Sequence, residues 1–174
     1  MKIIEFLGGP GAGKTTLSTR LFSRLKQDGK RVEFVREYAQ ELIFAGQEHL
    51  LADSNQLNVL AGQYTKYKNL ERLGYDLIIS DSSMSLSAVY ASDTTLNNLM
   101  NLLSNTAEEE FDIIKIFVTR DPDKNFNEIG RIHTYSESLE ADEMIRKKCG
   151  PFTKFLLPND NSVNDLLKLL EEDN

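Results

Sequence analysis

The sequence has very few of the residues that form disulfides and metal sites. Its 174 residues include one cysteine, Cys149, and two histidines, His49 and His133. A single cysteine cannot form a disulfide within the chain, and it excludes a zinc site built from several cysteines. No pattern around either histidine indicates a metal ligand. A chain of this length can bury a full hydrophobic core, and we expect it to form one domain over residues 1–174.

Long apolar runs and an excess of positive charge are also absent. No apolar run approaches the roughly 20 residues that a membrane-spanning helix needs, and the first residues indicate a strand rather than a signal peptide. We therefore expect a cytoplasmic protein with no membrane partner. The net charge of −7 repels polyanions, which disfavours DNA or RNA as a partner unless basic residues cluster. A small anionic substrate held by a few arginines remains compatible with this charge.

The most informative stretch is residues 8–15, GGPGAGKT, which fits the pattern G-x-x-x-x-G-K-[ST]. Residues 2–7 before it are apolar and predict a buried strand, and residues 16–25 after it predict a helix. A strand, a glycine-rich loop and a helix N-terminus in this order form a cradle for phosphate groups. Glycine permits the tight turn, while the loop N–H groups and the helix dipole attract phosphate oxygens.

Individual residues of this loop have separate expected roles. Lys14 can reach the β- and γ-phosphates as a mobile charge, and the Thr15 hydroxyl can ligate Mg²⁺. The motif therefore predicts a bound nucleoside triphosphate, without saying what happens to it. The residues expected to bind the nucleotide are Gly8, Gly9, Pro10, Gly11, Ala12, Gly13, Lys14, Thr15 and Thr16.

The rest of the chain alternates between apolar strands and amphipathic helices. Four further strands are predicted at residues 31–35, 75–81, 112–118 and 152–157. A strand–helix–strand unit of this length has parallel strands joined by a right-handed crossover. The sequence therefore predicts an α/β fold. We expect the acidic residues 108–110 to lie in a solvated linker.

Charged residues follow two of these strands directly. In parallel α/β sheets, ligands bind beyond the carboxyl ends of the strands. Asp81 ends the strand at 75–81 and resembles a Walker B carboxylate, which would bind Mg²⁺ through water or accept a proton from the attacking group. Its alternative role is a helix N-cap. Arg36 and Glu37 follow the second strand, either as substrate contacts or as a solvated charge pair that opens a helix.

Two more residues complete the candidate substrate site. Tyr38 comes directly after Glu37, and Gln56 lies at the start of the long helix predicted at 53–73. The amide of Gln56 can hydrogen-bond to a base or a sugar. The candidate substrate-binding set is therefore Arg36, Glu37, Tyr38 and Gln56.

The polar segment at about 120–133 follows the strand at 112–118 and has the composition of a mobile lid. It carries three basic residues, Arg120, Lys124 and Arg131, together with the chain-breaking residues Pro122 and Gly130. Such a lid brings arginines over a transferring phosphoryl group and excludes water. Arg131 and then Arg120 are the candidates for stabilising the transition state. The alternative is an ordinary charged surface loop, because nearby acids nearly balance the bases.

The phosphate loop near residue 8, Asp81 after an apolar strand and the arginine-bearing segment together resemble the P-loop kinases of nucleosides and nucleotides. The compact chain, with Arg36-Glu37-Tyr38 after the second strand, looks most like small kinase-like P-loop proteins of bacteriophages and is similar to ribosylnicotinamide-kinase-like domains. The resemblance implies a three-layer P-loop NTPase fold with about five parallel strands flanked by helices. It also implies ATP with Mg²⁺ as phosphoryl donor, an acceptor site near Glu37 and lid arginines on the phosphates.

The sequence departs from these families at one informative place. Asp81 is followed by Ser82-Ser83, where many nucleoside and nucleotide kinases have an acidic residue and an arginine. The arginine that would bind the acceptor is therefore unassigned, with Arg36 as a substitute. The sensor segments of oligomeric AAA+ motors are also missing, and the chain is too short for their helical lid domain.

The function predicted from this resemblance is transfer of the γ-phosphoryl group of ATP to a small nucleoside or nucleotide, as in a nucleoside monophosphate kinase. The expected metal ligands are Thr15 and Asp81. The residues expected to be catalytic are Lys14, Asp81, Arg131, Arg120 and Glu37. One alternative acceptor is a hydroxymethylated base in phage DNA, and a phage-encoded chain would work in the host cytoplasm. A second alternative is a nucleotide-dependent switch or ATPase that acts through a protein partner.

Overall fold

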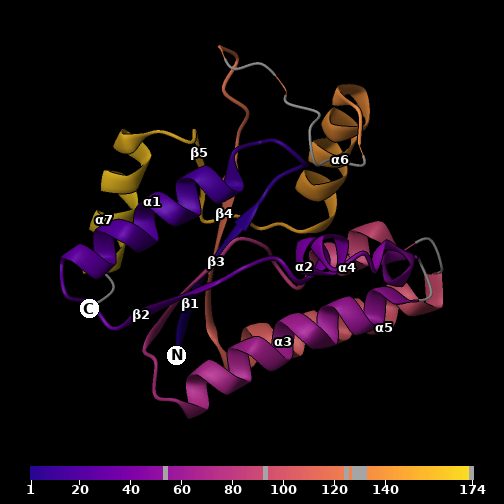
Figure 1. The fold of residues 1–174 in the computed structure, drawn as a ribbon, viewed down its shortest axis with the longest axis horizontal. Coiled ribbons are helices and arrows are strands. Elements are labelled where there is room, and N and C mark those ends of the chain that lie inside the picture. The colour runs from indigo at the N-terminus through magenta and orange to yellow at the C-terminus, as the bar shows by residue number, and fades with distance from the viewer. Residues whose placement is uncertain (53–54, 92–93, 124–125, 127–132, 173–174) are drawn as a thin grey trace.

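Helices and strands alternate along the chain in a computed structural model that describes residues 1–52, 55–91, 94–123, 126 and 133–172 (Figure 1). The strands are β1 (Lys2–Leu7), β2 (Val32–Val35), β3 (Leu77–Ser80), β4 (Asp112–Val118) and β5 (Lys154–Leu156). The helices are α1 (Lys14–Gln27), α2 (Tyr38–Phe44), α3 (Gln56–Arg72), α4 (Leu86–Tyr90), α5 (Thr94–Glu110), α6 (Tyr135–Lys148) and α7 (Asp160–Glu172), with a 3₁₀ turn, η1, at Glu48–Leu51.

The five strands form one parallel sheet in the order β2-β3-β1-β4-β5. The central strand β1 pairs on both sides, so that Ile3 lies opposite Ile78 of β3 and Ile113 of β4. Because all strands run the same way, their carboxyl ends meet at one edge of the sheet. The phosphate loop after β1 and Asp81 after β3 therefore lie at the same edge. The predicted α/β fold with a five-stranded parallel sheet is confirmed.

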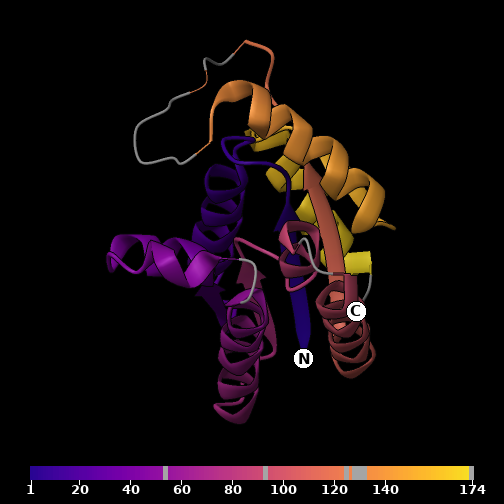
Figure 2. The same ribbon diagram turned by 90° about the vertical axis from the view of Figure 1, so that its right-hand side faces the viewer.

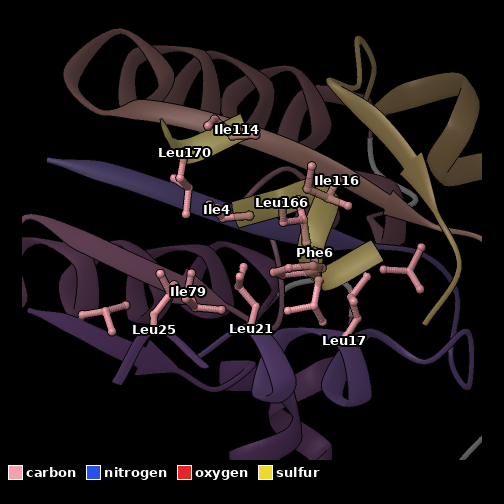
Figure 3. Packing of buried hydrophobic residues seen from close by; sticks show 13 residues of the cluster. Ile4, Phe6, Leu17, Leu21, Leu25, Ile79, Ile114, Ile116, Leu166 and Leu170 are labelled. Atoms are coloured by element: carbon pink, nitrogen blue, oxygen red, sulfur yellow. The ribbon is translucent and has the colours of Figure 1, made fainter. Parts of the chain in front are cut away.

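Apolar side chains of β1 alternate between the two faces of the sheet. Ile4 and Phe6 pack against α1 and α7 on one face, whereas Ile3 and Leu7 face the layer that contains α3, α4, α5 and α6. Figure 3 shows the first of these cores, in which Leu17 and Leu21 of α1 lie against Phe6. Each fully buried side chain of this size contributes roughly 1.5–3 kcal/mol. The first core fixes α1, and hence the phosphate loop, on the sheet.

The acidic residues 108–110 lie in the last turn of α5 rather than in a linker, so that expectation is wrong. The reason is the packing of α5 beside α3. The Glu110 carboxylate accepts hydrogen bonds from Lys68, at 2.5 Å, and from the Tyr64 hydroxyl, at 2.6 Å. Glu108 pairs with Lys115 of β4. These partners hold the acids on a helix whose sequence alone shows only a charge run.

The helices α2 and α6 both lie close to the phosphate loop. Figure 2 shows α2 (purple) extending to the left of the sheet and α6 (orange) at the top, next to the loop that follows β1. Among the helices of the described residues, none is both long and apolar enough to span a membrane.

Candidate functional site

The phosphate loop turns through glycines with left-handed backbone angles. Gly8 has φ 144°, Gly11 has φ 81° and Gly13 has φ 101°, a region that side chains with a Cβ rarely adopt. Space is also limiting: a Cβ on Gly8 would lie 2.9 Å from the Val118 carbonyl oxygen, and one on Gly13 would lie 2.7 Å from the Pro158 ring. The loop is thus pressed against the chain after β4 and β5, and glycine is required for two independent reasons.

Lys14 begins α1 and folds back over the loop. Its Nζ donates hydrogen bonds to the carbonyl oxygens of Gly8, at 2.9 Å, and Gly9, at 3.4 Å. Gly13, the N-cap of α1, has no side chain to accept a bond from the first N–H groups of the helix. These N–H groups and the positive end of the helix dipole are therefore available to an anion. The loop has the donors and the charge that a phosphate group needs.

A buried ion pair ties the other side of the loop to α6. The Asp142 carboxylate accepts hydrogen bonds from the Gly9 N–H and from Arg120 Nε, both at 2.5 Å. Arg120 Nη2 also donates to the carbonyl oxygens of Pro10, at 3.0 Å, and Ser138, at 2.9 Å. The side chains of Arg120 and Asp142 are only 15% and 10% exposed. The pair fixes the backbone of the loop at two successive residues.

Asp142 is not among the residues predicted from the sequence, because it belongs to no motif and does not follow a strand. One signal was present in the sequence. Asp142 follows Ala141 and precedes Ile145 by three residues, so it lies on the apolar face of α6, and all three side chains are buried. A charged residue on the buried face of a helix needs a partner, and that partner is Arg120.

Asp81, the second predicted metal ligand, contacts two residues of α1 directly after the phosphate loop. Asp81 is 2% exposed, and its carboxylate accepts hydrogen bonds from the hydroxyls of Thr15, at 2.6 Å, and Ser18, at 3.2 Å. Burial raises the pKa of Asp81, although the Lys14 ammonium and the two hydroxyl donors oppose the shift. The oxygens of Thr15 and Asp81 are the hard ligands that Mg²⁺ prefers.

No group of three or more histidine, cysteine, aspartate or glutamate side chains that could hold a metal occurs among the described residues. A metal held there by one hydroxyl and one carboxylate would take its other ligands from phosphates and water, as Mg²⁺ commonly does. The residues at Thr15 and Asp81 therefore fit Mg²⁺ bound together with a nucleotide.

Glu37 is the N-cap of α2 and lies across from these groups. Burial raises the pKa of its carboxyl, the Lys14 ammonium lowers it, and the Asp81 carboxylate raises it further. Both charges act on Glu37 because all three side chains converge on the same edge of the sheet. Next to it, the Tyr38 N–H donates to Gln63 Oε1 at 3.2 Å. The Tyr38 ring packs on Gly62 of α3, where an added Cβ would lie 2.6 Å from the ring atom Cδ1.

One cleft of about 830 Å³ joins the phosphate loop to α2, α3 and α4. Its size is near the upper end of the roughly 300–1,000 Å³ typical of small-molecule sites. Of the predicted residues, it is lined by Glu37, Tyr38, Gln56, Arg120 and most of the phosphate loop. Arg36 does not line the cleft: its side chain is exposed, and its carbonyl oxygen accepts a bond from Lys66.

The predicted lid is described only in part. Arg120, Asp121, Pro122 and Phe126 line the cleft, whereas Arg131, the first candidate for stabilising the transition state, lies outside the described residues, as does Lys124. The lid over about 120–133 and the role of Arg131 therefore stay predictions.

The comparisons with known proteins agree with this geometry. A family model described as an AAA domain matches residues 3–152, which is most of the chain. The chain therefore belongs to this family, and the predicted membership in the P-loop NTPase superfamily is confirmed. No curated protein matches the chain.

Solved structures with the same fold include two kinases. APS kinase CysC of Mycobacterium tuberculosis matches with a TM-score of 0.58 and 14% identity over 98% of this chain and 97% of that one. Shikimate kinase from Aquifex aeolicus vf5 matches with a TM-score of 0.56 and 14% identity over 99% of this chain and 98% of that one. At this identity the likeness shows the fold, which is that of the P-loop kinases.

Proposed function

We propose that this member of the AAA domain family is an ATP-dependent phosphotransferase that moves the γ-phosphoryl group of ATP to a small acceptor. The observation that carries the proposal is a cleft lined by Lys14, Thr15 and Glu37, with the buried Asp81 carboxylate hydrogen-bonded to Thr15 behind its wall. The cleft continues past the phosphate loop to α2, α3 and α4, so it has room for a second ligand beside the nucleotide. The names of the two structural neighbours, both kinases, support the same reaction class.

The phosphate loop would hold the donor. Phosphate oxygens would replace the Gly8 and Gly9 carbonyl oxygens as partners of the Lys14 ammonium, and the free N–H groups at the start of α1 would bind the same phosphates. Mg²⁺, held by Thr15 and Asp81, would neutralise charge on the β- and γ-phosphates. Positive groups aligned in advance with the charge that develops on the transferring group are the main source of catalysis in such reactions.

Glu37 is the group best suited to take the proton from the acceptor hydroxyl. Glu37 lines the cleft, and burial raises the pKa of its carboxyl above the ordinary value, which makes the carboxylate a stronger general base. The Asp81 carboxylate is less suited, because Thr15 and Ser18 already donate to both of its oxygens. We therefore assign proton acceptance to Glu37 and metal binding to Asp81.

Arg120 would support the loop rather than contact the transferring group directly. Its guanidinium is occupied by Asp142 and by two carbonyl oxygens. Stabilisation of the developing charge would then come from Lys14 and the loop N–H groups, with Arg131 as the predicted further contributor from the lid.

The test compares Lys14→Ala with Lys26→Ala. Lys26 lies on the exposed face of the same helix, α1, so its substitution removes the same charge away from the cleft. We expect Lys14→Ala to lower acceptor-stimulated ADP release by about 100-fold or more, the usual cost of removing one such donor. Lys26→Ala should match the wild type, and both variants should keep the wild-type circular dichroism spectrum. A fully active Lys14→Ala protein would refute the proposal.

A further inference from the structure

The half of the cleft farther from the phosphate loop has an uncharged lining. The walls that α2, η1, α3 and α4 contribute are apolar or carry neutral amides and hydroxyls. Six of these residues are Gln40, Phe44, Leu51, Gln56, Val59 and Leu86. Within the described ranges, no lysine or arginine from these four elements lines the cleft.

The described basic residues that do line the cleft belong elsewhere. Lys14 lies on the phosphate loop and bonds to its carbonyl oxygens, and Arg120 is paired with Asp142 under the same loop. His133 lies beside Tyr90, with ring centroids 6.4 Å apart. The Glu37 carboxylate also lines the cleft, and after burial its negative charge helps to raise the pKa of Tyr90. The described side chains that α2, η1, α3 and α4 contribute to the cleft are therefore uncharged, and the described charged side chain that borders them, Glu37, is negative.

We infer that the phosphoryl acceptor is an uncharged, hydroxyl-bearing molecule with a flat ring, of about nucleoside size, that carries no phosphate, sulfate or carboxylate of its own. The inference rests on the proposed function. An anionic group in this half would lose water without gaining a cationic partner from the described residues of α2, η1, α3 and α4, and the Glu37 carboxylate lines the same cleft. A neutral acceptor meets neither cost.

The walls also fit a flat ring. Phe44 lines the cleft yet is 65% exposed, which leaves an aromatic face open for stacking. Gln40, one helical turn before Phe44, is half-buried and lines the same wall. Its amide can both donate and accept hydrogen bonds at a ring edge. Gln63 is less available, because it accepts from the Tyr38 N–H and donates to the Ser80 hydroxyl at 2.9 Å.

In the transfer step, the acceptor hydroxyl oxygen forms a bond to the γ-phosphorus of ATP. The bond from that phosphorus to the bridging oxygen breaks, and ADP leaves with the electron pair. The hydroxyl proton passes to Glu37. The products are ADP and the phosphomonoester of the acceptor, so charge and atoms balance without a further reactant.

The experiment compares matched pairs that differ only by one phosphate. Adenosine, guanosine, cytidine, uridine and thymidine are each tested with their 5′-monophosphates, by turnover with Mg·ATP and by calorimetric binding to the Mg·ADP-saturated protein. We expect at least one nucleoside to exceed its monophosphate by about tenfold or more in kcat/KM or affinity, equivalent to about 1.4 kcal/mol. Preference for a monophosphate would overturn the inference while leaving the phosphotransferase proposal intact. Binding of neither member of any pair would overturn it as well.

A charge-insertion variant tests whether this wall is the acceptor site. Gln40→Arg adds a cation inside the cleft, and Asn58→Arg adds the same charge on the exposed face of α3. We expect Gln40→Arg to shift the monophosphate-to-nucleoside ratio of kcat/KM, or of affinity, upward by about tenfold, and Asn58→Arg to leave it unchanged. A folded Gln40→Arg protein with the wild-type ratio would contradict the assignment. A Lys14→Ala protein that phosphorylates the acceptor at the wild-type rate would instead refute the proposed function.

Discussion

Asp142 offers the sharpest test of how the phosphate loop is held. Its carboxylate accepts from the Gly9 N–H and from Arg120, so Asp142→Ala leaves a guanidinium that is 15% exposed without its counter-charge. Breaking a buried pair in this way costs about 3–5 kcal/mol. Because both side chains keep some contact with water, we expect Asp142→Ala to lower the free energy of unfolding by about 3 kcal/mol, the lower end of this range. For a chain of this size that corresponds to a fall in Tm of about 6–12 °C.

The same substitution should weaken nucleotide binding. Without Asp142, the Gly9 N–H has lost its partner and the loop backbone is held on one side only. We expect the Kd for Mg·ADP to rise by about tenfold, measured by calorimetry below the Tm of the variant. Glu143→Ala, on the exposed face of the same helix, is the matched control and should change stability by less than about 0.5 kcal/mol.

A double-mutant cycle separates the pair from its surroundings. If the ion pair accounts for the loss, Arg120→Ala combined with Asp142→Ala should be more stable than the sum of the two single changes predicts, by about 1–3 kcal/mol. Wild-type stability and nucleotide affinity in Asp142→Ala would refute the assignment of this pair as the clamp of the loop.

Two further predictions follow from the backbone and from a buried acid. Gly13→Ala should abolish measurable Mg·ADP binding in calorimetry, because the new Cβ would lie 2.7 Å from a proline ring and displace the loop. Left-handed backbone strain should in addition lower the free energy of unfolding by about 1–2 kcal/mol. Gly29→Ala, at φ 72° with nothing within 4 Å of its Cβ, should show this destabilisation without the loss of binding. Burial raises the pKa of Glu5 above its ordinary value of 4.5, so the folded protein holds this proton more tightly than the unfolded chain does. That stabilising contribution is full below 4.5 and is lost as the pH rises through the folded-state value. Urea unfolding at about pH 5 and about pH 8 should therefore show a smaller decrease for Glu5→Gln than for the wild type; equal decreases would contradict the shift.

Local pattern was enough to predict the architecture. The strand before the phosphate loop was predicted at 2–7 and is β1 at Lys2–Leu7, and α1 ends at Gln27 before the Asp28-Gly29 turn. Apolar runs and glycine breaks are local properties, and a parallel sheet follows from strands that alternate with helices. The rule that ligands bind beyond the carboxyl ends of parallel strands also predicted Asp81 and Glu37 at one edge of the sheet. In the structure the Lys14 charge acts on both carboxyl groups.

Contacts between distant segments could not be predicted in this way. Asp142 reaches Gly9 across 133 positions in the sequence, and only the packing of α6 against the loop brings them together. Glu5 is 1% exposed inside the sheet and accepts a hydrogen bond from the Tyr67 hydroxyl at 3.0 Å, although strand alternation alone gives no partner for it. Arg36 and Glu37 are neighbours in sequence, yet only Glu37 lines the cleft, because successive residues at a strand end point in different directions.

The proposed phosphoryl transfer is tested most directly by following the γ-phosphoryl group of ATP itself. The protein is incubated with Mg·ATP whose γ-phosphoryl oxygens carry a heavy isotope, together with the nucleoside panel, and the products are separated by mass. Our account predicts that the label appears in a phosphomonoester of one acceptor and that Lys14→Ala abolishes that product. Label found only in inorganic phosphate, with no acceptor modified, would contradict the account and favour a nucleotide-dependent switch that acts through a protein partner.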